Sequence, residues 1–485
     1  MLKEIQSKLF ETRILIDGEW RDSDSGETFS IKNPSTGETI ACVPKGGQAE
    51  TREAIKAAQR AFHGWSKLTA NERAEFLMEL KRLMNENKHD LALLMSSEMG
   101  KPILEAENEV VYAAEFLSWY GEEGKRIYGE TIPASSKEKR LFVSKQPVGV
   151  TAAITPWNFP IAMVTRKIGP ALAAGCTSVI KPSSESPLTA LAFGKLVELS
   201  GIPKGVINIV TGSSAEISEE IFSHPAVRKI SFTGSTKVGK LLVTKSASQL
   251  KKLSLELGGH APFIVFDDAD LDKAAEGAVA SKFRNAGQTC ICANRIYVHE
   301  NVKDQFIDIF AQKVRKLSVG KSVDKTTQVG PLINSAGIDK VKEHVEDALA
   351  KGASVACGGK QLNSLGELFY EPTVLKDVTN DMLIMSEETF GPVAPIISFS
   401  GEEEVIQSAN DTDYGLAAYL YTSNVNRAVR LSEELQFGVI GLNDAVPAVP
   451  QAPFGGLKQS GFGREGGRSG LNEYLEEKFI SLGLQ

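Results

Sequence analysis

The feature that most constrains the fold is an alternation of short apolar runs and helical segments that begins at Val148. Apolar runs with the sequences GVTAAIT, TSVIK, VINIVTG, KISFTG and KLSLELGG alternate with helical segments over 162–174, 188–199 and 238–246. This alternation is typical of βαβ units, in which helices cover both faces of a parallel sheet. The sequence therefore predicts an α/β protein.

A second series of the same kind follows Gly259. It starts with the apolar run APFIVF and the helical segment DLDKAAEGAVASKFRNA, and it ends with the helical segment NRAVRLSEEL and the run GVIGLN. A chain of 485 residues exceeds what one hydrophobic core normally supports. We therefore expect two doubly wound parallel-sheet domains, with the Gly258-Gly259 pair as a hinge between them.

Three parts of the chain lie outside these two series. Residues 47–120 have helical periodicity with charged residues on the polar positions, which predicts amphipathic helices. The segments KRLFVSKQPV at 139–148 and NEYLEEKFISLGL at the C-terminal end look like strands, the second with no hairpin partner nearby. Since an unpaired strand can bind another chain, these two segments suggest an oligomer.

Composition excludes several classes of partner. The net charge is −7, and no basic run is present, so nucleic acid and acidic membrane surfaces are not expected partners. The first residues mix charges into each apolar run, and no later run reaches transmembrane length, so we expect a cytoplasmic protein. The five cysteines are odd in number and mostly scattered, which indicates neither a disulfide framework nor a metal site.

The stretch FRNAGQTCICANR at 283–295 contains a candidate nucleophile. Cys290 follows a turn that contains a glycine, and Arg284 and Arg295 flank it. A thiolate is a better nucleophile than a thiol, and a nearby cation lowers the pKa of the thiol. A buried cysteine that only fills apolar space would give the same local pattern.

Two further segments at predicted strand ends carry polar groups suited to catalysis. In TPWNFP, two prolines and two aromatic residues restrict the backbone around Asn158, whose amide can donate two hydrogen bonds. An Asn that caps the next helix is the alternative. In ELGG, Glu256 ends an apolar strand, and burial would raise its pKa and suit it to general base work. An exposed strand-end carboxylate or a hinge salt bridge is the alternative.

Two more strand ends have the composition of nucleotide-binding turns. They are Lys181-Pro182-Ser183-Ser184 and the FTGS turn at 232–235, where a helix opens after Gly234 and Ser235. Glycine at such a turn lets backbone amides approach a phosphate, and the helix N-terminus favours its charge. The pattern differs from the common G-x-G-x-x-G fingerprint.

Together these segments resemble the aldehyde dehydrogenase superfamily over nearly the whole chain. PWNFP, KPS, FTGS, LELGG, GQTC, EETFGPV at 387–393 and PFGGLKQSGFGREGG at 453–467 occur in the order of that family. The resemblance implies a cofactor-binding domain at 1–124 and 149–257, a catalytic domain at 258–470, and an oligomerisation element at 125–148 and 471–485. A homodimer or a homotetramer is expected.

The resemblance also implies the catalytic roles. Cys290 would attack the aldehyde carbon so that its hydrogen leaves as hydride, and Glu256 would activate the water that hydrolyses the resulting thioester. The Asn158 side chain and the Cys290 N–H would bind the oxyanion. The joint presence of Cys290, Glu256, Asn158 and Lys181 argues against a non-catalytic binding protein of this fold. A hydrolase that pairs a cysteine with a histidine would leave the nucleotide segments unexplained, and no histidine lies in a comparable motif.

For the cofactor, the resemblance assigns the adenine ribose to Lys181, the pyrophosphate to Gly234 and Ser235, and the nicotinamide ribose and ring to Glu388 and Phe390. Trp157, Ser183 and Leu257 would line the same cleft. Members that prefer NAD tend to carry glutamate at position 184, whereas this chain has Ser184. A serine removes the repulsion of a 2′-phosphate, so we predict NADP, with NAD tolerated. Neighbouring Glu185 lies close enough in sequence to reach the same ribose.

For the substrate, Arg166 and Arg284 match arginines that bind the carboxylate in succinate semialdehyde dehydrogenases. The alternative for both arginines is an ordinary charge on a helix surface. That subfamily often has a serine where this chain has Ala448, so glutarate semialdehyde and 2-oxoglutarate semialdehyde are alternatives. A phosphorylated aldehyde such as glyceraldehyde-3-phosphate is a further alternative substrate.

In some relatives a cysteine at the position of Cys292 forms a regulatory disulfide with the nucleophile. The alternative is that Cys292 only lines the pocket.

Overall fold

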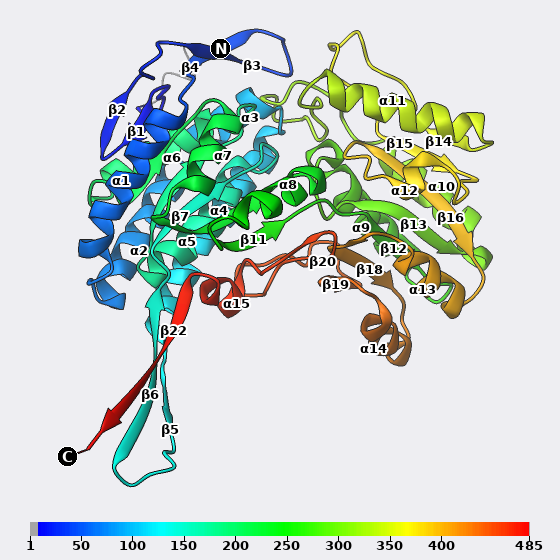
Figure 1. Cartoon of the computed structure of the whole chain (residues 1–485). Coiled ribbons are helices and arrows are strands. Elements are labelled where there is room, and N and C mark those ends of the chain that lie inside the picture. The colour runs from blue at the N-terminus through cyan, green and yellow to red at the C-terminus, as the bar shows by residue number, and fades with distance from the viewer. Residues whose placement is uncertain (1–7, 485) are drawn as a thin grey trace.

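The computed structural model describes residues 8–484 and contains two lobes and a protruding arm (Figure 1). The first lobe is built on an eight-stranded sheet with the order β2-β1-β9-β8-β7-β10-β11-β21. Its strands are β1 (Ile14–Ile16), β2 (Glu19–Arg21), β7 (Val150–Ile154), β8 (Thr177–Lys181), β9 (Ile207–Ile209), β10 (Val227–Thr233), β11 (Lys252–Glu256) and β21 (Gly461–Phe462). The five strands from β7 to β11 are parallel, and antiparallel strands close both edges.

Helices cover both faces of this sheet, as the alternation predicts. They are α1 (Gln48–Trp65), α2 (Ala70–Glu86), α3 (Lys88–Met99), α4 (Ile103–Glu123), α5 (Pro160–Ala174), α6 (Leu188–Leu199), α7 (Ser214–Ser223), α8 (Thr236–Ser246) and α15 (Gly467–Asn472). Helix α5 is buried along its whole length and packs against α4. A separate hairpin, β3 (Thr28–Lys32) with β4 (Thr39–Pro44), lies at the edge of the lobe.

The second lobe holds a seven-stranded sheet with the order β14-β15-β16-β13-β12-β18-β19, parallel except for β14. Its strands are β12 (Ala261–Val265), β13 (Ala293–His299), β14 (Ser354–Cys357), β15 (Thr373–Lys376), β16 (Val393–Phe399), β18 (Ala417–Tyr421) and β19 (Val439–Leu442). Its helices are α9 (Leu271–Phe283), α10 (Lys303–Val314), α11 (Ser335–Ala350), α12 (Leu383–Ser386), α13 (Glu402–Asn410) and α14 (Val425–Glu434). The α/β architecture with two sheets is confirmed.

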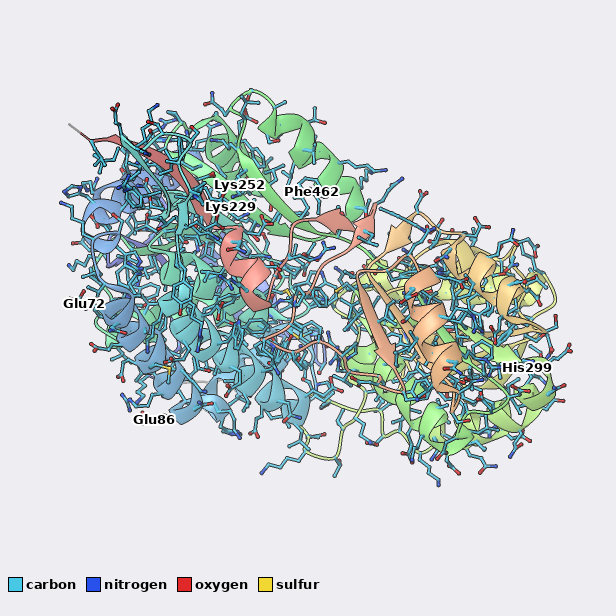
Figure 2. The ribbon with its side chains drawn as sticks, turned by 90° about the horizontal axis from the view of Figure 1, so that it is seen from below. Glu72, Glu86, Lys229, Lys252, His299 and Phe462 are labelled. Atoms are coloured by element: carbon cyan, nitrogen blue, oxygen red, sulfur yellow. The ribbon has the colours of Figure 1, made fainter. Side chains whose placement is uncertain are left out.

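The chain crosses between the lobes twice. The first crossing is at Gly258-Gly259, between β11 and β12, where the sequence predicts a hinge. The second follows a small ribbon of β17 (Tyr414–Gly415) and β20 (Leu457–Lys458), after which β21 joins the first sheet beside β11. Figure 2 shows Phe462 of β21 near this junction, with Lys229 and Lys252 in one lobe and His299 in the other.

The arm corrects one prediction. The C-terminal strand β22 (Leu475–Gly483) has a partner within the chain, because it pairs antiparallel with β6 (Lys139–Pro147) over nine positions. Strand β5 (Glu130–Ile132) completes a three-stranded sheet that projects from the first lobe (Figure 1). The pairing joins segments more than 300 residues apart, so no local turn in the sequence indicates it.

Two helices also differ from the expectation. The predicted helix over 270–286 ends at Phe283, because Asn285 and Ala286 adopt left-handed backbone angles. Helix α11 is absent from the predicted series, although its buried Ile338 and Val341 have helical spacing. Within residues 8–484, no helix combines the length and the apolar character needed to cross a membrane.

Candidate active site

Cys290 is placed by a tight turn at the junction of the lobes. After α9, Asn285, Ala286 and Gly287 have φ angles of 51°, 54° and 75°, and the chain then reaches Cys290 before β13 begins. A Cβ atom on Gly287 would lie 2.1 Å from the carbonyl oxygen of Gly391. On the other side, a Cβ atom on Gly259 would lie 2.2 Å from the carbonyl oxygen of Cys290. Both glycines are therefore required by close backbone contacts.

The half-buried Cys290 lines a cavity of about 570 Å³. The walls come from α4, α5, α9 and the loops at 317–329 and 446–454. Residues that contribute polar or charged groups to the walls are Lys101, Glu105, Asn108, Glu109, Tyr112, Arg166, Arg284, Thr289, Thr327 and Gln328. The rest of the wall is largely apolar and includes Phe159, Phe454 and Ala448. A compact ligand with few polar groups suits such a cavity.

The two predicted arginines both line this cavity, but their environments differ. Arg166 on α5 is 3% exposed, its Nε lies 3.0 Å from Oε2 of Glu465, and its guanidinium lies 4.1 Å from the centre of the Phe454 ring. The surface-charge alternative is therefore wrong for Arg166. Arg284 is the first residue after α9, and its Nε has no hydrogen-bond partner. Among residues 8–484, Arg284 makes no ion pair with a carboxylate within 4 Å.

Glu256 is 2% exposed at the end of β11, and neither carboxylate oxygen has a hydrogen-bond partner in the described chain. Burial, reinforced by the nearby charge of Glu465, raises the pKa of Glu256 well above its usual range, although Arg166 and Lys167 oppose the shift. The alternatives of an exposed residue or a hinge salt bridge are wrong. Glu256 does not line the cavity of Cys290. Its Oε1 lies close to Gly455, where an added Cβ atom would be 2.9 Å from that oxygen.

The environment of Cys290 corrects the expected direction of its pKa. Burial raises the pKa of the Cys290 thiol to about 12, with a contribution from the carboxylates of Glu388 and Glu256. Arg166 and Arg284 act in the opposite direction, but desolvation is the larger effect. The resting chain therefore holds Cys290 as a neutral thiol.

Asn158 lies beside the turn that carries Cys290. Its side-chain Nδ2 donates to the carbonyl of Gln288 at 3.0 Å. Its backbone carbonyl accepts from Nζ of Lys101 at 2.8 Å and from Nδ2 of Asn285 at 3.1 Å. Lys101 also forms a buried ion pair with Glu109. These bonds fix Asn158 from both lobes.

Sequence reasoning missed four charged residues of this region. Glu109 accepts from the N–H groups of Ile161 and Ala162 at the start of α5, both at 3.2 Å, while it pairs with Lys101. Glu465 pairs with Lys167 as well as with Arg166. Each pair joins segments that are distant in the sequence or hidden in helical charge patterns, so no local motif indicates it.

The turns predicted to bind a nucleotide lie at strand ends of the first sheet. Lys181 is buried, and its Nζ donates to Oγ of Ser214 at 2.8 Å. Burial lowers the pKa of Lys181 to about 8, and Lys181 has no ion pair in the part of the chain that the structure describes. Ser183 is half-buried, while Ser184 lies exposed in a second, polar cavity of about 950 Å³. A buried ammonium without a carboxylate suits an anionic ligand.

At the FTGS turn, Oγ of Ser235 accepts from the N–H of Val238 at 3.3 Å and caps α8. A Cβ atom on Gly234 would lie 2.5 Å from the Phe232 ring, so the turn requires glycine. The turn thus lies at the N-terminus of an eleven-residue helix. Such a terminus favours a phosphate.

The remaining cofactor candidates gather near the Gly258-Gly259 crossing. Glu388 accepts from the N–H of Gly259 at 3.1 Å, and burial raises its pKa to about 7. Phe390 has a φ angle of 52°, and its ring meets Trp157 edge-on at 5.7 Å. Leu257 is buried in the first lobe. The structure thus brings residues of both lobes to one crossing point.

Cys292 is a free thiol that is 1% exposed, and its Sγ donates to the carbonyl of Lys282 at 3.3 Å. It is not among the residues that line the cavity, so the alternative of a pocket-lining residue is wrong. A redox bridge to Cys290 stays a prediction. Across residues 8–484, no group of three or more His, Cys, Asp or Glu side chains is arranged to hold a metal ion.

A fold with two α/β lobes, a cysteine between them and phosphate-type turns on the first sheet defines a nucleotide-dependent oxidoreductase. The model of the aldehyde dehydrogenase family matches residues 20–480, so the chain belongs to that family. It is an enzyme that oxidises aldehydes.

The chain is similar to several characterised relatives. It is 53% identical to a succinate-semialdehyde dehydrogenase of Escherichia coli (strain K12) whose name specifies NADP(+), over 100% of both chains. It is 54% identical to a glutarate-semialdehyde dehydrogenase of Pseudomonas aeruginosa, over 98% of this chain and 99% of the relative. The crystal structure of an NADP-dependent enzyme of E. coli matches with a TM-score of 0.98 and 53% identity, over 99% of both chains.

The raised pKa of Cys290 predicts slow alkylation of the free enzyme at neutral pH. Only the thiolate reacts, and its fraction rises about tenfold per pH unit below the pKa. We expect the rate of iodoacetamide labelling at Cys290 to rise about tenfold for each unit between pH 7 and 9, without a plateau. Peptide mass spectrometry measures the rate, with the exposed Cys42 as an internal reference. A plateau between pH 6 and 8 would contradict the neutral thiol.

The contact between Gly259 and the Cys290 carbonyl predicts that Gly259→Ala displaces the nucleophile. We expect kcat to fall by about 100-fold, because a shift of about 1 Å at a reacting group has an effect of that size. Gly64→Ala in α1 is the matched control, since a Cβ atom there meets nothing within 4 Å. Steady-state kinetics and the melting temperature of both variants make the comparison, and a normal kcat for Gly259→Ala would refute this role of the contact.

Proposed function

We propose that this enzyme oxidises succinate semialdehyde to succinate with NADP. The observation that carries the proposal is the cavity that both Cys290 and Arg284 line, with no carboxylate of residues 8–484 in ion-pair contact with Arg284. An aldehyde with a distal carboxylate can present its carbonyl to Cys290 and its charge to Arg284. The names of the similar E. coli and P. aeruginosa enzymes support the same class of substrate.

In the proposed mechanism, the Cys290 thiol releases its proton to water, its sulfur adds to the aldehyde carbon, and the carbonyl oxygen becomes an oxyanion. Nδ2 of Asn158 carries two hydrogens, of which one is donated to Gln288, so the other is available for this oxyanion. The Cys290 N–H is the second proposed donor. Loss of one such donor typically lowers the rate by about two to three orders of magnitude.

When bound, the nicotinamide supplies the acceptor for the hydride that leaves the former aldehyde carbon. The residues proposed to hold the cofactor are Trp157, Lys181, Ser183, Ser184, Gly234, Ser235, Leu257, Glu388 and Phe390. The fit rests on the buried ammonium of Lys181 and on the glycine turn at the start of α8. Loss of the hydride leaves an acyl thioester on Cys290.

Glu256 then removes a proton from the water that attacks this thioester, and Cys290 leaves as the acid forms. The raised pKa makes Glu256 a stronger base than an ordinary carboxylate. Because Glu256 does not line the cavity, this step requires its side chain to rotate toward Cys290.

The preference for NADP rests on the turn at 181–184. Ser184 is exposed beside the second cavity and has no negative charge, while Lys181 pairs with no carboxylate among the described residues. The carboxylate of Glu185 accepts from Nδ2 of Asn334 at 3.4 Å, which draws it toward the second lobe. A 2′-phosphate therefore meets less repulsion at this turn than a glutamate at position 184 would give, and NAD is tolerated.

Glutarate semialdehyde is the second candidate substrate. Ala448 lines the cavity where a serine would narrow it and add a hydroxyl. A volume of about 570 Å³ leaves space for one more methylene group. The cavity therefore accommodates both the four-carbon and the five-carbon semialdehyde in this proposal.

The proposed assembly is a homodimer or a homotetramer formed through the element at 125–148 and 471–485. Phe479, Ile480 and Leu482 on β22 are exposed, which is unusual for a projecting sheet in a monomer. A reducing compartment such as the cytoplasm suits a chain whose five cysteines are all free. The proposed cofactor and catalytic domains are 1–124 with 149–257, and 258–470.

The test is an assay of NADPH or NADH formation at 340 nm with ω-carboxy aldehydes and with neutral aldehydes. We expect activity with NADP and a lower KM for the ω-carboxy aldehydes. Arg284→Ala should raise that KM by about 10- to 100-fold, since a charge-assisted bond contributes about 1.5 to 3 kcal/mol. Arg315→Ala, outside the cavity, is the control. Equal KM values for charged and neutral aldehydes in the wild type would refute the substrate assignment.

A further inference from the structure

Several charged side chains around the substrate cavity form buried ion pairs. Lys101 pairs with Glu109, and Arg166 and Lys167 share Glu465. All five of these side chains are buried, so each pair is removed from solvent. Arg284 is the cation of this group that has no carboxylate in ion-pair contact within the described chain.

A further carboxylate, Glu105, lies near Arg284. It lies on α4 and lines the same cavity. Its Oε2 accepts from the N–H of Asn285, the residue that follows Arg284, at 2.8 Å. Lys101 and Arg284 favour its ionised form, while burial disfavours that form and raises its pKa. Glu105 is thus held in the cavity wall near Arg284, the cation that an incoming anion would meet.

The cavity wall therefore contains Arg284, which has no ion pair within the described residues, and a carboxylate near it, Glu105. A ligand with one negative charge can pair with Arg284. A second negative charge on the ligand would lie in a cavity whose walls are largely apolar, and Glu105 would repel it. Like charges in a site of low polarity repel strongly.

We propose that Glu105 restricts the distal group of the substrate to a single negative charge. The site then takes compact aldehydes that end in a carboxylate or in a sulfonate, and it rejects aldehydes that end in a doubly charged phosphate or phosphonate. Selection is by charge, because a sulfonate and a phosphonate have the same tetrahedral shape. This inference rests on the proposed function, in which Arg284 binds the distal anion.

The test compares three aldehydes of one chain length in the wild type and in Glu105→Gln. They are succinate semialdehyde, 3-sulfopropanal and 3-phosphonopropanal, assayed at pH 8.5, where the phosphonate carries two charges. Glutamine keeps an oxygen for the Asn285 N–H but removes the charge. In the wild type we expect kcat/KM for the phosphonate to be at least about 100-fold below that for the sulfonate. Glu105→Gln should raise the ratio of phosphonate to sulfonate by about tenfold or more.

Glu107→Gln is the matched control, because it makes the same change on α4 at a carboxylate that pairs with Lys88 and His89 outside the cavity. It should leave all three kcat/KM values unchanged. If Glu105→Gln lowers the three values equally, Glu105 only supports the Asn285 turn, and the inference is overturned. A wild type that uses the phosphonate as well as the sulfonate also overturns it, while the proposed function stands. No activity with succinate semialdehyde would overturn both.

Discussion

The buried carboxylate of Glu465 is the interaction on which the rest of the site depends. It pairs with both Arg166 and Lys167 on α5, and Lys167 also donates to Oγ1 of Thr233 at the end of β10 at 2.6 Å. The loop that carries Glu465 is thereby fixed against the first sheet, next to the second crossing between the lobes. Removing one partner from such a buried group leaves an uncompensated charge, which typically costs about 3 to 5 kcal/mol. The same carboxylate helps to raise the pKa of Glu256, because its charge opposes a second negative charge nearby.

The site exists only where the two lobes meet. The first lobe contributes Asn158, Arg166 and Glu256, and the second contributes Arg284 and Cys290. Close backbone contacts hold the turn that carries Cys290, since Gly259 touches the Cys290 carbonyl and Gly287 touches Gly391. The bond from Asn158 to the carbonyl of Gln288 joins this turn to the first lobe. Binding, nucleophilic attack and hydrolysis therefore use groups from both lobes, and small shifts at the crossing change their relative positions. The lobes thus need to fold and pack before any of these residues can act together.

Much of this could be predicted from the sequence because it depends on local pattern. The alternation after Val148 predicts both sheets, and short motifs predict Asn158, Glu256 and Cys290 as a group. Long-range pairing could not be predicted in this way. The partner of β22 is β6, more than 300 residues away, and Glu465 meets Arg166 and Lys167 only in the fold. The direction of the Cys290 pKa was wrong because nearby arginines are visible in a sequence, whereas desolvation depends on burial. Glu105 was missed because one more glutamate on a charged helix has no local signature.

The central claim is that Cys290 carries the acyl group and that Glu256 is needed to release it. It is tested most directly by mixing the Glu256→Gln variant with succinate semialdehyde and NADP, then following NADPH in the first turnover and mapping the protein by mass spectrometry. The account predicts a burst of about one NADPH per active site, followed by very slow turnover, with a succinyl group on the peptide that contains Cys290. Continued turnover at the wild-type rate, or an acyl group on a different residue, would contradict the account.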